Sequence, residues 1–321
     1  MIKLIKLLSD GRFHSGEELG SLLGISRGAI WKHLQRIEAE YGVELHRVPG
    51  KGYRIAEAIS VLDADRIKTN LLVYGWYLHF LETVDSTNAE AFRLLRSGVP
   101  APFLVLAEAQ TEGRGRRGRR WESPAAQNIY LTLALRVDNG PRALSGLSLV
   151  IGLAVRQALQ RFGVGDCKVK WPNDVYANQR KIAGILLELI GDPADVCHVV
   201  IGVGINVNMY RCGSSVDQPW TSVKEQLGRL ADRNELAGCV IDSLHSYTGR
   251  HAVEGFGPLR GEWESENIWQ GKRCLLSTGS LDVRGLVLGV DDYGALRLAI
   301  EGEGERCFSG GELSLRLEDD S

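Results

Sequence analysis

The sequence predicts an α+β protein that is built from three units. Residues 1–58 show helical and then extended hydrophobic periodicity, and residues 66–268 contain many apolar strands without a regular alternation of strand and helix. Residues 270–321 contain short apolar runs that are separated by glycines. The length of 321 residues agrees with two or three domains, because one domain usually has roughly 100–200 residues. We therefore expect a small helical unit with a hairpin, a central mixed sheet and a small β-barrel.

Composition and charge exclude several classes of protein. Hydrophobic residues make up 44% of the chain and charged residues 24%, which excludes collagen-like and wholly disordered chains. The longest apolar runs, such as 147–155, are shorter than the roughly 20 residues of a membrane span, and the N-terminus does not resemble a signal peptide. We therefore expect a cytoplasmic protein without a membrane partner. Lys and Arg (38) nearly balance Asp and Glu (40), so a polyanion would need a local basic patch.

The first 58 residues predict a winged helix-turn-helix. Ser15 and Glu18 have the spacing of a capping box for a helix that ends at Gly24, and Ser26 can cap the next helix. Two extended segments follow on either side of the turn at residues 49–52, which gives the hairpin expected of a wing.

The same unit carries a modest positive charge. Nine Lys and Arg stand against seven Asp and Glu, a net charge of +2 (9 − 7), which favours binding to DNA. A small helical module for protein interaction is the alternative. The residues that we expect to face DNA are Ser26, Arg27, Trp31, Lys32, Gln35, Arg36 and Lys51.

A short linker over residues 56–66 precedes the central unit. Its predicted helices cover 86–96, 142–162 and 232–251, and its predicted strands cover 103–109, 128–136, 167–171, 181–190 and 196–207. The last 21 residues contain seven acids and two arginines, a net charge of −5 (2 − 7). That tail predicts a solvated surface, with contact to a partner or domain as the alternative.

An arginine-rich loop lies directly after the predicted strand 103–109. Five arginines occupy seven positions between Arg114 and Arg120, interleaved with glycines and closed by Trp121. The letters match GxGxxG, but Pro124 prevents the helix that a dinucleotide-binding fold needs at this place. Clustered arginines need an anion and glycines allow its close approach, so the loop predicts a lid over a phosphate-bearing ligand. A solvated basic loop or a nucleic-acid patch is the alternative.

Lys181 begins an almost wholly apolar strand, shortly after the segment Lys170 to Asp174. A cation that enters a buried sheet needs a partner, which is either a carboxylate such as that of Asp174 or a ligand phosphate. Both interpretations remain open at this level.

Two further segments indicate either a site or local packing. Gly202 and Gly204 alternate within a strand that ends at Asn206, which marks close approach of a ligand or tight packing of the sheet. The segment Asp85 to Asn88 precedes a helix and could simply cap it.

Other kinds of catalytic site are not indicated. The seven histidines form no triad with Ser or Cys, and the six cysteines are too far apart for zinc or redox spacing. We therefore predict no protein-bound metal and no permanently bound cofactor.

Taken together, these segments resemble the biotin–protein ligase family. The resemblance is based on the segments 85–88, Gln110 with the loop 113–118, 170–174, 181–186 and 202–206, which occur in the order found in that family. With its predicted winged helix, the chain is similar to the bifunctional ligases that also repress the biotin operon. This resemblance implies a class II synthetase-like ligase domain at 66–268 and an SH3-like barrel at 270–321.

The resemblance also implies the reaction and its residues. ATP, entering with Mg²⁺, and biotin would form biotinyl-5′-AMP, and a lysine of the biotin carboxyl carrier domain of acetyl-CoA carboxylase would then take the biotin. Lys181 and Arg116 would be catalytic. Contacts to biotin and adenylate would come from Ser86, Thr87, Asn88, Gln110, Arg114, Gly115, Arg116, Lys181, Gly202, Gly204 and Asn206. Further nucleotide contacts would come from Arg117, Arg119, Asn173, Asp174, Trp220 and Arg316.

For repression, the resemblance implies a homodimer that carries biotinyl-5′-AMP and binds operator DNA. Two other functions fit the residues: a non-enzymatic regulator that senses a ligand, and a lipoate-type ligase that forms an acyl adenylate. Residues 209–219 and the tail after Leu317 contain no motif of the family. The operator sequence does not follow from the recognition helix 26–40, because base readout depends on register and dimer spacing.

Overall fold

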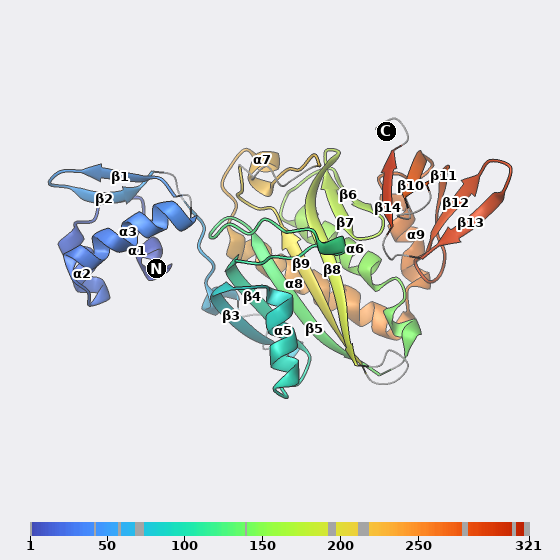
Figure 1. Ribbon diagram of the computed structural model, residues 1–321, viewed down its shortest axis with the longest axis horizontal. Helices are drawn as coiled ribbons and strands as arrows, with labels where there is room; N and C mark the ends of the chain where they lie inside the picture. Colours follow the sequence, from blue (N-terminus) through green and yellow to red (C-terminus); the bar gives the residue numbers. More distant parts are fainter. Residues whose placement is uncertain are drawn as a thin grey trace.

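A computed structural model of the chain arranges it as a head, a central sheet with helices and a small C-terminal unit, with the central sheet between the other two (Figure 1). It describes residues 2–41, 43–56, 59–67, 74–138, 140–191, 197–210, 218–277, 282–309 and 313–317.

The head is the predicted winged helix-turn-helix. It contains α1 (Ile2–Leu8), α2 (Gly16–Leu23), α3 (Arg27–Tyr41), β1 (Leu45–Val48) and β2 (Gly52–Ile55). The capping box of Ser15 and Glu18 forms as predicted, and Gly24 ends α2 in the left-handed conformation that glycine adopts readily. Gly52 has φ +100, and a Cβ there would lie 2.0 Å from the carbonyl oxygen of His14. The wing therefore requires glycine where it meets the loop before α2.

The central unit is a seven-stranded mixed sheet, which confirms the predicted α+β class. Its order is β3-β4-β5-β9-β8-β7-β6, and only the pair β3 and β4 among these described strands is parallel. The strands are β3 (Tyr77–Val84), β4 (Phe103–Gln110), β5 (Ile129–Val137), β6 (Cys167–Lys170), β7 (Asp174–Ala177), β8 (Arg180–Gly191) and β9 (Cys197–Ile205). The sequence did not predict β3, which is a half-exposed edge strand, or β7, which has four residues.

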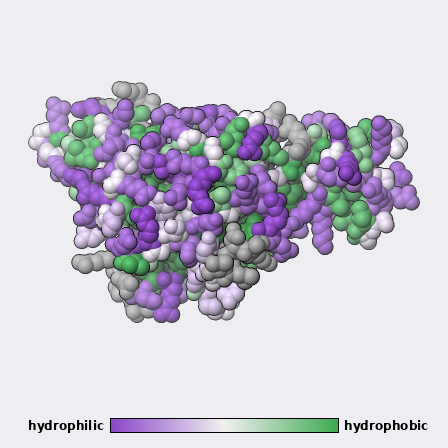
Figure 2. All heavy atoms as spheres, turned by 180° about the vertical axis from the view of Figure 1, so that it is seen from behind, coloured by the Kyte–Doolittle hydropathy of each residue, from purple (hydrophilic) through white to green (hydrophobic). Residues whose placement is uncertain are grey.

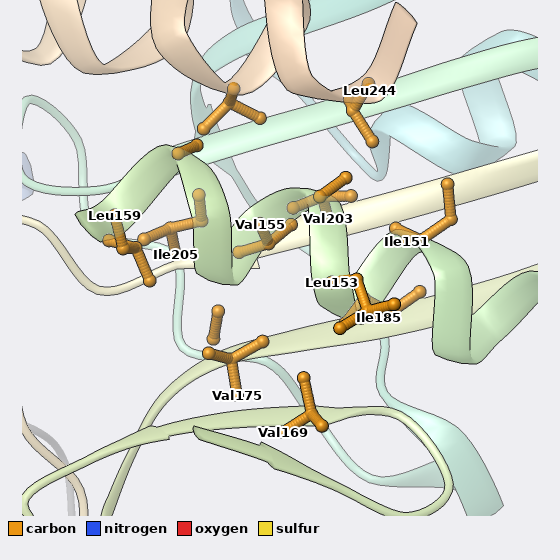
Figure 3. Packing of buried hydrophobic residues seen from close by; sticks show 14 of the residues in the cluster. Ile151, Leu153, Val155, Leu159, Val169, Val175, Ile185, Val203, Ile205 and Leu244 are labelled. Atoms are coloured by element: carbon orange, nitrogen blue, oxygen red, sulfur yellow. The ribbon is translucent and has the colours of Figure 1, made fainter. Parts of the chain in front are cut away.

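Helices cover the two faces of this sheet differently. On one face, α6 (Leu147–Arg161) packs on the sheet and α8 (Arg233–Glu254) packs on α6, so that Leu153, Val203 and Leu244 belong to one core (Figure 3). The opposite face is covered only in part, by α5 (Thr87–Arg96), whose Ala91 packs with Phe103. Strand residues alternate between the faces, so one face is available for a site.

Shorter helices complete the central unit. They include η1 (Arg116–Gly118), η2 (Pro141–Leu144), α7 (Val223–Leu227) and α9 (Gly257–Glu266), which were not predicted as separate helices.

The C-terminal unit is an antiparallel sheet in the order β13-β12-β11-β10-β14. Its core is continuous with that of the central unit, because Leu276 and Leu296 pack in the same cluster as α6. Trp171 donates its indole N–H to the carbonyl of Gly294 (3.1 Å), which fixes the unit against the turn between β6 and β7. The strands are β10 (Arg273–Ser277), β11 (Asp282–Val290), β12 (Leu296–Ile300), β13 (Gly304–Phe308) and β14 (Ser314–Leu317).

A buried ion pair fixes the linker between the head and the sheet. Arg233 at the start of α8 and Glu108 on β4 are 2.7 Å apart, and their side chains are 0% and 1% exposed. Arg233 also donates to the carbonyls of Ser60 (2.8 Å) and Asn128 (2.8 Å), and Glu108 accepts from the N–H of Leu62. The linker segment is therefore part of the core of the central unit.

The rear surface of the molecule is mainly hydrophilic, and its hydrophobic residues lie in small separate patches (Figure 2). None of the helices that the structure describes is long and apolar enough to span a membrane.

Replacing Arg233 by Met should reduce the free energy of unfolding by about 3–5 kcal/mol, because Glu108 would remain buried without its charged partner. Urea unfolding measures this change. The double variant Glu108→Leu, Arg233→Met should be more stable than Arg233→Met alone, since no charge is then left unpaired. A loss of less than about 1 kcal/mol in the single variant would contradict the importance of the pair.

Candidate functional site

A cavity of about 870 Å³ opens on the side of the sheet that carries α5. On β9 the apolar residues Val203 and Ile205 point into the core, whereas Gly202 and Gly204 lie on the cavity face. On β8 the neighbouring Gly184 pairs with Gly204 and also lines the cavity. These three glycines form the floor of the cavity, and because they have no side chains, Trp121 and the amide of Asn88 pack directly against their backbone.

The arginine-rich loop folds into a small hairpin over this floor. The N–H of Trp121 donates to the carbonyl of Gly113 (2.9 Å), and the N–H of Gly115 donates to that of Arg119 (2.8 Å). At the tip, Arg117 has φ 61, a left-handed conformation that is uncommon for residues other than glycine. Arg116 donates to Asn173 Oδ1 (3.0 Å), which ties the tip to the turn between β6 and β7. Burial lowers the pKa of Arg116.

Trp121 fills the space above the glycines. A Cβ on Gly204 would lie 2.5 Å from Trp121 Cε2, and one on Gly184 would lie 3.1 Å from Trp121 Cζ3. The indole nitrogen is buried and has no hydrogen-bond partner among the described residues. Such a donor is costly to leave unpaired, so it marks a place where a ligand acceptor would be favourable.

The N-terminus of α5 supplies polar groups to one end of the cavity. Ser86 is 4% exposed and occupies the N-cap position, but in the described chain its hydroxyl makes no capping hydrogen bond. Thr87 donates its N–H and hydroxyl to Gln110 Oε1 (2.9 and 3.1 Å). Asn88 accepts from Thr132 Oγ1 (2.7 Å). A hydroxyl that does not cap the helix is free for a ligand, which favours the site interpretation of this segment over the capping one.

Lys181 is paired with a carboxylate inside the cavity. Its Nζ is 2.7 Å from Asp174 Oδ1, and both side chains are 14% exposed. The same ammonium lies 5.6 Å from the centre of the Trp121 ring. The segment with Trp220 runs beside Lys181, whose backbone N–H and carbonyl bond to Pro219 and Thr221 (3.0 and 2.9 Å). Both interpretations of Lys181 are thus compatible: it has a carboxylate partner and remains within reach of a ligand.

Lys170 lies between aromatic rings at the end of the cavity near the C-terminal unit. Its ammonium is 4.1 Å from the Trp269 ring centre and donates to the hydroxyl of Tyr176 (3.0 Å). Burial lowers the pKa of Lys170 to about 8, while the nearby Asp174 opposes this shift. Arg316 on β14 completes this end, where the C-terminal sheet lines the cavity.

The cavity is strongly positive. Its described lining includes eight Lys and Arg side chains and two carboxylates, those of Glu122 and Asp174, a formal charge of +6 (8 − 2). Low-dielectric walls strengthen such a field, so an anion is the fitting ligand. Within the described ranges, no group of three His, Cys, Asp or Glu side chains could hold a metal ion.

Every residue for which the resemblance implies contact with biotin or nucleotide lines this one cavity. The set is Ser86, Thr87, Asn88, Gln110, Arg114, Gly115, Arg116, Arg117, Arg119, Asn173, Asp174, Lys181, Gly202, Gly204, Asn206, Trp220 and Arg316. Their individual roles remain predictions. Asn206 uses its amide internally, donating to the carbonyl of Thr221 (3.1 Å).

Some participants were not predicted. Lys170 belongs to the segment Lys170 to Asp174, but no role was predicted for it. Its ammonium lies over the ring of Trp269, which is 99 positions away in sequence. Glu188 was not predicted either; it lies outside the cavity lining and accepts hydrogen bonds from Asn88 and Arg114, which line the cavity. Residues 211–217, with Cys212, and the tail from 318 lie outside the described residues.

The head presents the predicted DNA-facing residues to solvent. On α3, Trp31, Lys32, Gln35 and Arg36 are exposed, whereas Leu34 and its apolar neighbours are buried. Ser26, Arg27 and the wing residue Lys51 are exposed as well. This arrangement suits insertion of α3 into a major groove.

Comparison with known proteins gives consistent similarities. The Biotin/lipoate A/B protein ligase family matches residues 80–206, and an HTH domain matches residues 1–54. The chain is 42% identical over 319 residues to the "Bifunctional ligase/repressor BirA" of Salmonella typhimurium, covering 98% of this chain and 97% of that protein. It is 34% identical over 251 residues to the "Biotin--[acetyl-CoA-carboxylase] ligase" of Mycobacterium tuberculosis, covering 75% and 91%.

A solved structure is similar as well. The biotin protein ligase from Aquifex aeolicus, in complex with biotin and ATP, superposes with a TM-score of 0.66 at 31% identity. The match covers 75% of this chain and 99% of that one.

The lowered pKa of Lys170 predicts how stability depends on pH. Between about pH 8 and the ordinary lysine value of 10.5, the unfolded chain holds a proton that the folded chain has lost, so stability rises with pH. Relative to Lys170→Met, the wild type should gain about 2–3 kcal/mol from pH 8 to 10. Urea unfolding at several pH values measures this, with Lys168→Met on the same strand as control. A constant difference between wild type and Lys170→Met would contradict the prediction.

Proposed function

Because the chain belongs to the family of bifunctional biotin–protein ligases and repressors, we propose that its cavity joins biotin to ATP and transfers biotin to a carrier lysine. One observation carries this proposal. A positive cavity with a backbone floor extends from the polar end at Asn88 to Lys181 and Arg316, under a loop of five arginines. The neutral ring system of biotin would lie at the Asn88 end, the biotin carboxylate near Lys181, and the nucleotide toward Arg316.

The reaction takes place in two steps. The biotin carboxylate attacks the α-phosphorus of ATP, a bond from oxygen to phosphorus forms, and pyrophosphate leaves. The lysine amine of a carrier domain then attacks the acyl carbon of biotinyl-5′-AMP, loses a proton, and releases AMP as the amide forms. Both steps concentrate negative charge at phosphate, which fixed cations stabilise.

Lys181 and Arg116 are the proposed catalytic cations. Each already has a polar partner, Asp174 for Lys181 and Asn173 for Arg116, so each is oriented before the ligand arrives. Mg²⁺ would enter bound to ATP and would neutralise phosphate charge, and Asp174 and Glu122 are the carboxylates of the described lining that could contact it. Biotin and ATP are consumed as substrates.

The arginine loop is proposed to protect the intermediate. Its hairpin covers the glycine floor, and closure over biotinyl-5′-AMP excludes water that would hydrolyse the mixed anhydride. The indole N–H of Trp121 is a free donor at this place, among the described groups, for an acceptor of the ligand.

The exposed face of α3 supports a second activity. We propose that the head binds operator DNA and that biotinyl-5′-AMP is the corepressor, which acts by favouring a homodimer with two recognition helices. ATP, a carrier domain and DNA meet in the cytoplasm, where we place the protein.

Incubation with biotin, ATP, Mg²⁺ and a carrier domain should label the carrier, as a streptavidin blot detects. Lys181→Gln should lower the rate of biotin-dependent pyrophosphate release about 10²- to 10³-fold, because a cation at the reacting phosphate is lost. Lys168→Gln is the matched control, since Lys168 pairs with Glu266 away from the cavity. Absence of labelling by the wild type would refute the ligase. Labelling of the carrier with lipoate and not with biotin would identify the protein as a lipoate-type ligase.

Biotinyl-5′-AMP should tighten binding to a duplex selected from a random pool by roughly 5- to 150-fold, the usual range of coupling between two sites. Fluorescence anisotropy at several salt concentrations measures it. Lys32→Ala should weaken binding and reduce the slope of log affinity against log salt by about 1, because one phosphate contact is lost. Lys3→Ala on α1 should leave both unchanged. An affinity that biotinyl-5′-AMP does not alter would separate DNA binding from the ligand.

A further inference from the structure

Glu188 on β8 joins two parts of the cavity wall from behind. One oxygen, Oε2, accepts a hydrogen bond from Asn88 Nδ2 (2.8 Å) and another from the guanidinium of Arg114 (3.0 Å). Asn88 belongs to α5 and Arg114 belongs to the arginine-rich loop, and both line the cavity. A single carboxylate therefore sets the distance between two elements that are far apart in the sequence.

The orientation of Asn88 depends on this carboxylate. Its Oδ1 accepts from Thr132 Oγ1 (2.7 Å), and its Nδ2 also donates to the carbonyl of Leu186 (3.3 Å). Gly202 leaves room for the amide, since a Cβ there would lie 2.5 Å from Asn88 Oδ1. The bond to Glu188 is charge-assisted, so it is the strongest of these contacts.

Arg114 is the arginine of the loop for which an ion pair with Glu188 is formed in the described part of the chain. It lies in the arm of the hairpin opposite Arg120, and its ion pair with Glu188 (3.0 Å) holds that arm against β8. The tip is held separately by Arg116 and Asn173. The polar contacts of Arg114 and Arg116 thus hold the loop to the sheet at its arm and at its tip.

We propose that Glu188 is a positioning residue of the ligase. It neutralises Arg114 and fixes the arm of the loop beside Asn88, which keeps the biotin end of the cavity closed. Arg114 then contributes its side chain to the structure of the loop and leaves the ligand phosphate to Arg116 and Lys181. This inference rests on the proposed ligase function, because it concerns retention of biotin and biotinyl-5′-AMP.

The test compares Glu188→Ala and Glu188→Gln with the wild type. Glu188→Ala should raise the KM for biotin and the dissociation rate of biotinyl-5′-AMP about tenfold, which corresponds to about 1.4 kcal/mol. Its kcat at saturating biotin should stay within about twofold, because Lys181 is untouched. For Glu188→Gln, the KM for biotin and the dissociation rate should lie between those of the wild type and Glu188→Ala, since an amide oxygen accepts hydrogen bonds without the charge. Glu305→Gln is the control: it breaks an ion pair with Arg297 (2.7 Å) in the C-terminal sheet.

Two further measurements separate positioning from general destabilisation. Trypsin should cut the ligand-free full chain within residues 114–120 faster in Glu188→Ala than in the wild type or the control. In a double-mutant cycle, Arg114→Gln should add little to the effect of Glu188→Gln, because the two changes remove one interaction. Additive effects, a normal KM with a normal dissociation rate, or a loss confined to kcat would overturn the proposal.

Failure of the proposed function would give a different result. If the wild type forms no biotinyl-5′-AMP, the ligase assignment fails, while the trypsin experiment still tests the attachment of the loop. If the wild type is active and Glu188→Ala is cut at the wild-type rate, the role of Glu188 alone fails.

Discussion

The buried ion pair of Glu108 and Arg233 connects strand β4, helix α8 and the linker that leads to the head. Glu108 lies two residues before Gln110, which borders the cavity, and Arg233 begins the helix that covers α6. Both residues bond the linker that leads to the head. A buried charge is costly unless its charged partner and its hydrogen-bond partners are all in place. The linker, the sheet and α8 must therefore adopt their positions together. The head is consequently attached to the same strand that carries part of the ligand site.

One face of the central sheet packs into the hydrophobic core, and the opposite face lines the ligand cavity. Branched and long apolar residues occupy the face under α6, where they form a core that continues into the C-terminal unit. The opposite face carries glycines, amides and hydroxyls, and it is covered by α5 at one end and the arginine-rich loop in the middle. Because strand residues alternate, each face could acquire its composition without disturbing the other.

The sequence allowed much of this to be predicted where the signal is local. Capping residues such as Ser15 mark their helices directly, and alternating glycines such as Gly202 mark a strand that something approaches closely. Features that depend on distant partners were not accessible. The short strand β7 has too few residues for a periodic pattern, and the surroundings of Lys170 come from Trp269. Likewise, nothing near Glu188 in sequence indicates that it meets Arg114, 74 positions earlier.

The glycine floor also limits how this cavity could evolve. Gly184, Gly202 and Gly204 have no side chain to lose, and a Cβ at any of them would push against Trp121 or Asn88, which pack directly on them. New specificity for a wider molecule would have to come from the opposite wall, at loop residues other than Arg114 and Arg116, to which the proposals above give fixed roles. Ligand specificity can therefore change through substitutions in the loop, whereas the three floor positions of the sheet must remain glycine.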